Sequence, residues 1–225
     1  MKPQHFPEPA MEKIELEFKG ITILAEQVVD LETVWQKLLD LGEDHPWVKD
    51  ERIPYWAEVW PSAIALSKHL ISKKTFLQGK SVLEIGCGLA IPGIVAAKLG
   101  AKVVISDYQQ DALDLAKHNW MLNHSQEPDC LQLDWRDPHP EMAADILLAS
   151  DVAYEKRSFE PLIAAFSTLV KPGGTIFISE PGRDFAREFL EKLSAQEYEK
   201  KETIIPVTWR KTKFEINVWE LRSIK

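Results

Sequence analysis

The stretch 81–93 constrains the fold of this chain more than any other part of the sequence. It reads Ser-Val-Leu-Glu-Ile-Gly-Cys-Gly-Leu-Ala-Ile-Pro-Gly, so an apolar run typical of a buried strand leads into Gly86 and Gly88 and then into a helical pattern. Glycine has no Cβ, which lets the backbone bend sharply and lets a ligand lie close against it. The stretch therefore predicts a nucleotide-like cofactor at the carboxyl end of a first parallel strand, although an ordinary tight turn can show the same pattern.

Apolar strand-like runs alternate with helical patterns along the rest of the chain, which is typical of a doubly wound parallel sheet. Two final strand-like runs have no helix between them and predict an antiparallel C-terminal hairpin at the sheet edge. We therefore expect an α/β fold with a mostly parallel, seven-stranded, Rossmann-like sheet. The predicted strands are 82–85, 102–106, 130–133, 144–149, 175–179, 198–207 and 213–222, and the predicted helices are 61–72, 91–99, 109–122, 159–170 and 184–193.

The N-terminal part predicts an extension to this sheet. Residues 1–10 are rich in proline and are expected to be poorly ordered, and apolar alternation about Lys19-Gly20 predicts a small β-hairpin. Helical spacing predicts a helix over 30–41, with Asp30 as its cap. We divide the chain into this extension, 1–52, and a main domain, 53–225. In the main domain we also expect a polar connection over 73–80 and a turn over 171–174, Lys-Pro-Gly-Gly.

Composition narrows the classes of partner. The formal net charge of −8 disfavours nucleic acid, because phosphate contacts need lysine and arginine. No run is long and apolar enough to cross a membrane, and no secretion signal is recognised at the N-terminus. Cys87 and Cys130 lie far apart, and neither they nor the histidines have metal-ligand spacing, so we expect a cytoplasmic protein with reduced thiols and no metal site. The sequence makes no prediction of the oligomeric state.

Acidic residues stand where the predicted parallel strands end. Carboxyl ends of parallel strands meet at one edge of such a sheet, where ligands bind in open α/β folds. Asp107 lies about twenty positions after the glycines and can accept both hydroxyls of a ribose. An exposed strand-end acid or a helix cap is the alternative interpretation. The residues at this edge are Glu84, Asp107, Asp134 and Asp151.

The glycine stretch distinguishes between two ribose-bearing cofactors. A dinucleotide fingerprint needs a third glycine where Ile91 stands, and little near the loop could neutralise a pyrophosphate. Glu84 would repel a pyrophosphate but could bind the ammonium of a methionine moiety, with or without a water between them. The pattern therefore favours S-adenosylmethionine.

Several motifs together resemble class I, seven-β-strand methyltransferases and, within them, the lysine-methyltransferase-like branch. The general match is carried by Val-Leu-Glu-Ile-Gly-Cys-Gly over 82–88, with Asp107 and Ser150-Asp151. The closer match is carried by Tyr-Trp-Ala-Glu-Val-Trp-Pro over 55–61, by Asp-x-x-Tyr over 151–154 and by Pro-Gly-Arg over 181–183, which is similar to electron-transfer flavoprotein β-subunit lysine methyltransferases. Relatives in this branch methylate valosin-containing protein and heat-shock proteins, and one is a reported histone arginine methyltransferase. The resemblance covers about 55–185 strongly and the last hairpin loosely.

The resemblance implies a role for each cofactor-site residue. Trp60 and Trp135 would lie near the adenosine, and Asp107 would hold the ribose. Aromatic rings suit both an adenine and a sulfonium, although simple core packing is the alternative for each tryptophan. The predicted cofactor-binding residues are Trp60, Glu84, Gly86, Gly88, Asp107, Trp135 and Ser150, with Gly86 and Gly88 beneath the methionine end and Ser150 acting through its backbone.

Asp151 and Tyr154 are the predicted catalytic residues. Methyl transfer from a sulfonium needs a nucleophile with a free lone pair, so a lysine ammonium must first lose its proton. Asp151 could hold the amine, and Tyr154 could orient it or stack on its stem, if the chain turns helically after the strand. Glu155 is a further candidate for attracting a cation, and a helix-capping role is the alternative for Asp151.

The sequence thus predicts an S-adenosylmethionine-dependent methyltransferase that acts on nitrogen, with an exposed lysine of a protein as the favoured acceptor. Two alternatives remain: a methyltransferase that acts on the nitrogen or oxygen of a small molecule, and a non-catalytic binding protein with this fold. We expect neither nucleic acid nor a membrane as a partner.

Overall fold

A computed structural model describes residues 10–49, 53–194 and 198–224, and shows a seven-stranded sheet with the order β5-β4-β3-β6-β7-β9-β8. The strands from β5 to β7 pair in parallel, β9 pairs antiparallel with β7, and β8 pairs antiparallel with β9. The predicted α/β fold with its C-terminal hairpin is confirmed. The strands are β3 (Ser81–Ile85), β4 (Lys102–Asp107), β5 (Asp129–Gln132), β6 (Ala144–Ser150), β7 (Val170–Glu180), β8 (Tyr198–Trp209) and β9 (Thr212–Ser223).

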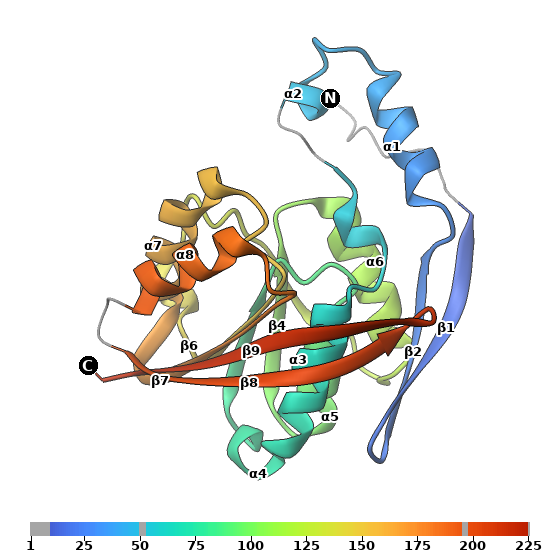
Figure 1. The fold of residues 1–225 in the computed structure, drawn as a ribbon. Coiled ribbons are helices and arrows are strands. Elements are labelled where there is room, and N and C mark those ends of the chain that lie inside the picture. The colour runs from blue at the N-terminus through green and yellow to red at the C-terminus, as the bar shows by residue number, and fades with distance from the viewer. Residues whose placement is uncertain (1–9, 50–52, 195–197, 225) are drawn as a thin grey trace.

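Helices cover both faces of the sheet (Figure 1). In the central strand β6, Ile146 and Leu148 face one helical layer while Leu147 and Ala149 face the other, and all four side chains are fully buried. A run that is apolar at every position is what a strand buried on both faces requires. One layer holds α3 (Pro61–Ser72), α5 (Ile91–Lys98) and α6 (Gln110–Met121), and the other holds α7 (Phe159–Leu169) and α8 (Asp184–Ser194).

Two local predictions in the main domain were wrong. The segment expected to be a polar connection contains a short helix, α4 (Lys74–Leu77), whose Leu77 is fully buried. The expected turn over 171–174 belongs to β7, where the pairing jumps from Ala144↔Val170 to Ile146↔Thr175. The intervening residues bulge out of the ladder, and a Cβ on Gly174 would lie 2.8 Å from the Lys171 carbonyl oxygen.

The predicted N-terminal hairpin and helix are present as β1 (Met11–Phe18), β2 (Ile21–Val28) and α1 (Leu31–Leu39). Asp30 caps α1 by accepting a hydrogen bond from the Thr33 amide, as expected. A short helix, α2 (Pro46–Lys49), follows, and Figure 1 shows α1 and α2 projecting beyond the sheet. The expected disorder of residues 1–10 and the proposed boundary at 52/53 fall almost wholly on residues outside the described part of the chain.

The hairpin is bound to the main domain by two asparagines of the α6 region. The Asn119 side chain accepts from the Glu26 amide (2.7 Å) and donates to the Glu26 carbonyl (3.1 Å). Asn123 pairs in the same way with Leu24, at 3.0 and 2.6 Å. These amide groups satisfy the free edge of β2, and Phe18 and Ile23 join the same apolar core as α5.

Candidate active site

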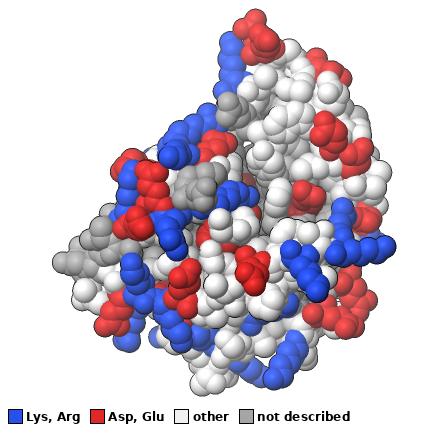
Figure 2. Space-filling model, in the orientation of Figure 1, with Lys and Arg blue, Asp and Glu red and all other residues white. Residues whose placement is uncertain are grey.

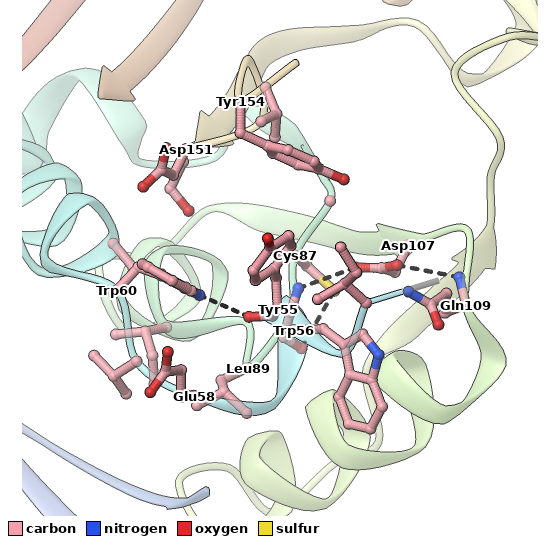
Figure 3. A pocket seen from close by; sticks show the side chains of 18 of the residues that line it. Tyr55, Trp56, Glu58, Trp60, Cys87, Leu89, Asp107, Gln109, Asp151 and Tyr154 are labelled. Atoms are coloured by element: carbon pink, nitrogen blue, oxygen red, sulfur yellow. Dashed lines mark hydrogen bonds between the residues drawn. The ribbon is translucent and has the colours of Figure 1, made fainter. Parts of the chain in front are cut away.

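A cavity of about 360 Å³ lies at the carboxyl ends of β3, β4 and β6 (Figure 3). Its volume falls in the range of about 300–1,000 Å³ typical of small-molecule sites. Trp60, Gly86, Gly88, Asp107, Trp135, Ser150, Asp151 and Tyr154, all predicted from the sequence, line it. Of the predicted residues, Glu84 does not line the cavity.

The loop between β3 and α5 forms one wall of the cavity and needs glycine at two positions. Gly86 and Gly88 have left-handed backbones, with φ of +57° and +50°. A Cβ on Gly86 would lie 3.0 Å from Val152 Cγ1, and one on Gly88 would lie 3.3 Å from the Trp56 carbonyl oxygen. Any other residue at these two positions would therefore be costly, because of both the backbone angle and the close approach.

Asp107, at the end of β4, holds this loop in place. Its carboxylate accepts hydrogen bonds from the backbone amides of Gly88 and Gln109, each at 3.1 Å. Burial raises the pKa of Asp107, while these amides partly offset the effect by stabilising its charge. A carboxylate has about four acceptor positions, so this one keeps capacity for the hydroxyls of a ligand.

Glu84 lies beneath the loop. Its Oε2 accepts a hydrogen bond from the Gly93 amide (3.0 Å), and its Oε1 has no hydrogen-bond partner among the described residues. Complete burial raises its pKa to about 8. Asp134, another of the strand-end acids, also lies outside the cavity lining and forms an ion pair with Arg136. The parallel sheet thus brings Asp107 and Asp151 to the cavity, and not all four acids.

The aromatic segment before α3 forms another part of the cavity wall. The Trp60 indole donates to the Tyr55 carbonyl (2.6 Å), and the Tyr55 ring meets the rings of Trp60 and Tyr154 edge-on at 5.9 and 5.5 Å. Gln27 of β2 accepts from the Val59 amide at 2.9 Å. The N-terminal hairpin therefore positions a wall of the site.

Asp151 follows β6 with a left-handed backbone, φ +56°, and its amide donates to the Ser179 carbonyl of β7. Its carboxylate forms an ion pair with the Arg183 guanidinium, and Ser62 Oγ lies 3.4 Å from Oδ2. The expected helical turn after the strand is absent from 151–154, yet Asp151 and Tyr154 both line the cavity. The alternative capping role is not seen, because α7 begins after Ser158.

Tyr154 stays neutral in this site. Tyr154 is 36% exposed, but partial burial of its phenol raises the pKa above the ordinary value of 10, and the nearby Glu155 carboxylate adds to the effect. A neutral phenol can donate one hydrogen bond and accept others.

Several lining residues were not assigned a role from the sequence, among them Tyr55, Glu58 and Arg183. Tyr55 and Glu58 belong to the aromatic segment, and Arg183 belongs to the Pro-Gly-Arg motif. The motifs were visible, but their chemistry depends on which distant residues they meet. Arg183, for example, is 32 positions from its partner Asp151.

The charges of the lining favour a cationic ligand. Glu58, Asp107, Asp151 and Glu155 supply carboxylates, while Arg183 supplies a guanidinium. This excess of acid suits a sulfonium and an ammonium, and disfavours a pyrophosphate. The glycine wall, the aromatic rings and the free capacity of Asp107 also fit S-adenosylmethionine. Among the described residues, no cluster of three or more His, Cys, Asp or Glu side chains could hold a metal ion.

Comparison with known proteins identifies the family. A family model described as lysine methyltransferase matches residues 49–196, and the chain belongs to this family. The histone-arginine methyltransferase METTL23 of Mus musculus is 34% identical over 125 residues, 53% of this chain and 49% of that protein. The protein N-lysine methyltransferase METTL21A of Danio rerio is 31% identical over 159 residues, 65% of this chain and 72% of that protein.

The electron transfer flavoprotein beta subunit lysine methyltransferase of Danio rerio is 30% identical over 132 residues, 58% of this chain and 51% of that protein. The chain thus spans about half the length of METTL23 from Mus musculus and of this flavoprotein methyltransferase.

Solved structures show the same fold. The rRNA methyltransferase RsmC of T. Thermophilus superposes with a TM-score of 0.66 at 14% identity, over 96% of this chain and 52% of that one. The N-methyltransferase NodS of Bradyrhizobium japonicum, in complex with S-adenosyl-L-homocysteine, gives 0.58 at 13% identity, over 87% of this chain and 97% of that one.

Proposed function

We propose that this chain is an S-adenosylmethionine-dependent methyltransferase that methylates nitrogen, with a lysine side chain of a protein as its acceptor. The observation that carries the proposal is the acid-rich cavity, in which the glycine loop, Asp107 and two tryptophans meet Asp151 and Tyr154. Family membership and the names of the relatives support a methyltransferase that acts on proteins.

The cofactor would supply the methyl group as part of a sulfonium. Asp107 would accept the ribose hydroxyls while it holds the Gly88 amide, and Trp60 and Trp135 would lie against the adenosine. Gly86 and Gly88 would let the methionine end approach the backbone, and Ser150 would contact it through its main chain. Glu84 would act indirectly, from beneath the loop, where its carboxyl group accepts a hydrogen bond from the Gly93 amide and keeps that amide in position.

Asp151 and Tyr154 would orient the acceptor nitrogen. A carboxylate hydrogen bond to an amine directs its lone pair, and the neutral phenol of Tyr154 can hydrogen-bond to the nitrogen or stack on the stem. Because Arg183 is already paired with Asp151, this carboxylate carries less free charge toward the acceptor than an unpaired one would.

We also propose a cytoplasmic location and a protein partner. Cys87 is buried, Cys130 is exposed, and both are free thiols, which fits a reducing compartment. No helix in the described part of the chain is long and apolar enough to cross a membrane. On the face shown in Figure 2, lysine and arginine are interspersed with acids, which gives no support to a nucleic-acid partner.

Transfer of label from tritiated S-adenosylmethionine tests the proposal. The purified chain is incubated with the labelled cofactor and a lysate, with Asp151→Asn as the matched variant. We expect label in protein bands, found by mass spectrometry on lysine, and far less with the variant. Label confined to small extractable compounds would instead support the small-molecule alternative, and no transfer to either fraction would support the non-catalytic one.

A further inference from the structure

A second cavity, of about 380 Å³, adjoins the first at the end remote from Asp107. Figure 3 shows Glu58, Trp60 and Asp151 at one end of the first cavity, opposite Asp107 and Gln109. The same three residues also line the second cavity, so this is where the two meet. The rest of its lining comes from the start of α3, from the segment after β7 and from the tip of the β8–β9 hairpin: Val59, Pro61, Pro181, Arg183, Trp209, Arg210, Thr212 and Phe214.

Most charged groups around this junction already have partners. Asp151 is paired with Arg183, and Arg210 is paired with Glu12 of β1. Glu58, by contrast, has neither a hydrogen bond nor an ion pair within the described part of the chain. It is half-buried, and burial raises its pKa while the more distant Arg210 acts in the opposite direction. One carboxylate without a hydrogen bond or ion pair among the described residues therefore lines both cavities.

The walls of the second cavity suit an apolar stem that ends in a cation. Trp60, Trp209 and Phe214 supply aromatic surface. Aromatic faces pack against methylene groups and attract cations. The Trp209 face already has a cationic neighbour, since the Arg210 guanidinium lies 5.8 Å from the ring centroid.

From this arrangement we infer that the second cavity admits the methyl acceptor and that Glu58 binds its ammonium group, so that an aliphatic ammonium side chain such as that of lysine is selected over a neutral one. The inference rests on the proposed function and names the acceptor side of the same site. Arg183 neutralises Asp151, so Glu58 supplies the free negative charge that attracts the acceptor. Asp151 then orients the nitrogen once it has arrived.

Binding of two matched peptides tests this inference without requiring turnover. One pentapeptide carries a single lysine between glycines, with both ends blocked, and the other carries norleucine, a neutral straight-chain residue, at that position. Each is titrated into the full chain saturated with S-adenosylhomocysteine and followed by NMR. We expect the wild-type chain to bind the lysine peptide at least about tenfold more tightly, because a hydrogen bond between two charged groups is stronger than any contact a neutral side chain can make there.

Glu58→Gln should reduce this preference to near one while S-adenosylhomocysteine affinity stays the same. Glu17→Gln removes the same charge from an exposed position on β1 and should leave the preference intact. Trp209→Ala, which alters only the second cavity, should weaken binding of both peptides. Arg183→Met should strengthen binding of the lysine peptide, because it frees Asp151.

Two results would overturn the inference: no lysine preference in the wild-type chain, or an unchanged preference in Glu58→Gln. Failure of the chain to bind S-adenosylhomocysteine, measured first by calorimetry, would instead contradict the proposed function.

Discussion

Glu84 shows how one buried residue links the glycine loop to the pH dependence of stability. Its pKa is raised from 4.5 to about 8, so the folded state binds this proton more tightly than the unfolded state does. The free energy of unfolding should therefore fall as the pH rises between these two values, by about 1.4 kcal/mol per pH unit.

Glu84→Gln should remove this dependence while its amide oxygen still accepts from Gly93. We expect the stability of the variant relative to the wild type to rise by about 2 to 3 kcal/mol between pH 6 and pH 8. Urea denaturation at both pH values measures this change. If the free energy of unfolding differs between the variant and the wild type by the same amount at both pH values, Glu84 does not titrate in this range.

In the proposed function, Asp151 orients the acceptor and is not one of the cofactor-binding residues. Asp151→Asn should leave S-adenosylhomocysteine affinity unchanged and lower turnover by about 10²–10⁴-fold, the usual size of such positioning and proton-transfer effects. Calorimetry and label transfer measure the two quantities. Asp134→Asn, a strand-end acid outside the cavity, is the control that should retain turnover, and full activity of Asp151→Asn would refute the assigned role.

At the scale of elements, the N-terminal hairpin supports the site, because Asn119 binds it to α6 and Gln27 connects it to the aromatic wall. Asn119 is fully buried and its hydrogen bonds to Glu26 are partly buried, so Asn119→Ala leaves the amide and carbonyl of Glu26 without these partners, which should cost about 1–3 kcal/mol.

Asn123→Ala is the matched control, because its hydrogen bonds to Leu24 are exposed and water can replace them. Thermal unfolding of both variants measures the difference. Equal losses of stability in the two variants would mean that burial does not decide how strongly the N-terminal hairpin is attached to α6.

The alternation of strands and helices was enough to predict the sheet, because its periodicity is local to each element. The start of β7 was missed since the bulge near Gly174 depends on pairing with Ala144 and Ile146, which local sequence does not encode. The same limit applies to the site. Asp107 and the glycines follow from neighbouring stretches, whereas the pairing of Asp151 with Arg183 and the isolation of Glu58 depend on segments far along the chain.

Across the whole molecule, charge and shape favour the same class of ligand. The net charge is −8, and the cavity concentrates carboxylates around a glycine loop that offers few partners for phosphate. A cation without a pyrophosphate is the ligand that this environment favours. The account therefore depends first on cofactor binding, and the choice of acceptor follows from it.

Isothermal titration calorimetry measures cofactor binding directly. The full chain is titrated with S-adenosylmethionine, with S-adenosylhomocysteine and, as a pyrophosphate-bearing control, with NAD. We predict saturable one-to-one binding of the first two ligands, no binding of NAD, and a loss of at least about tenfold in affinity for Asp107→Ala. No heat from either adenosyl ligand at millimolar concentration, or preferential binding of NAD, would contradict the account.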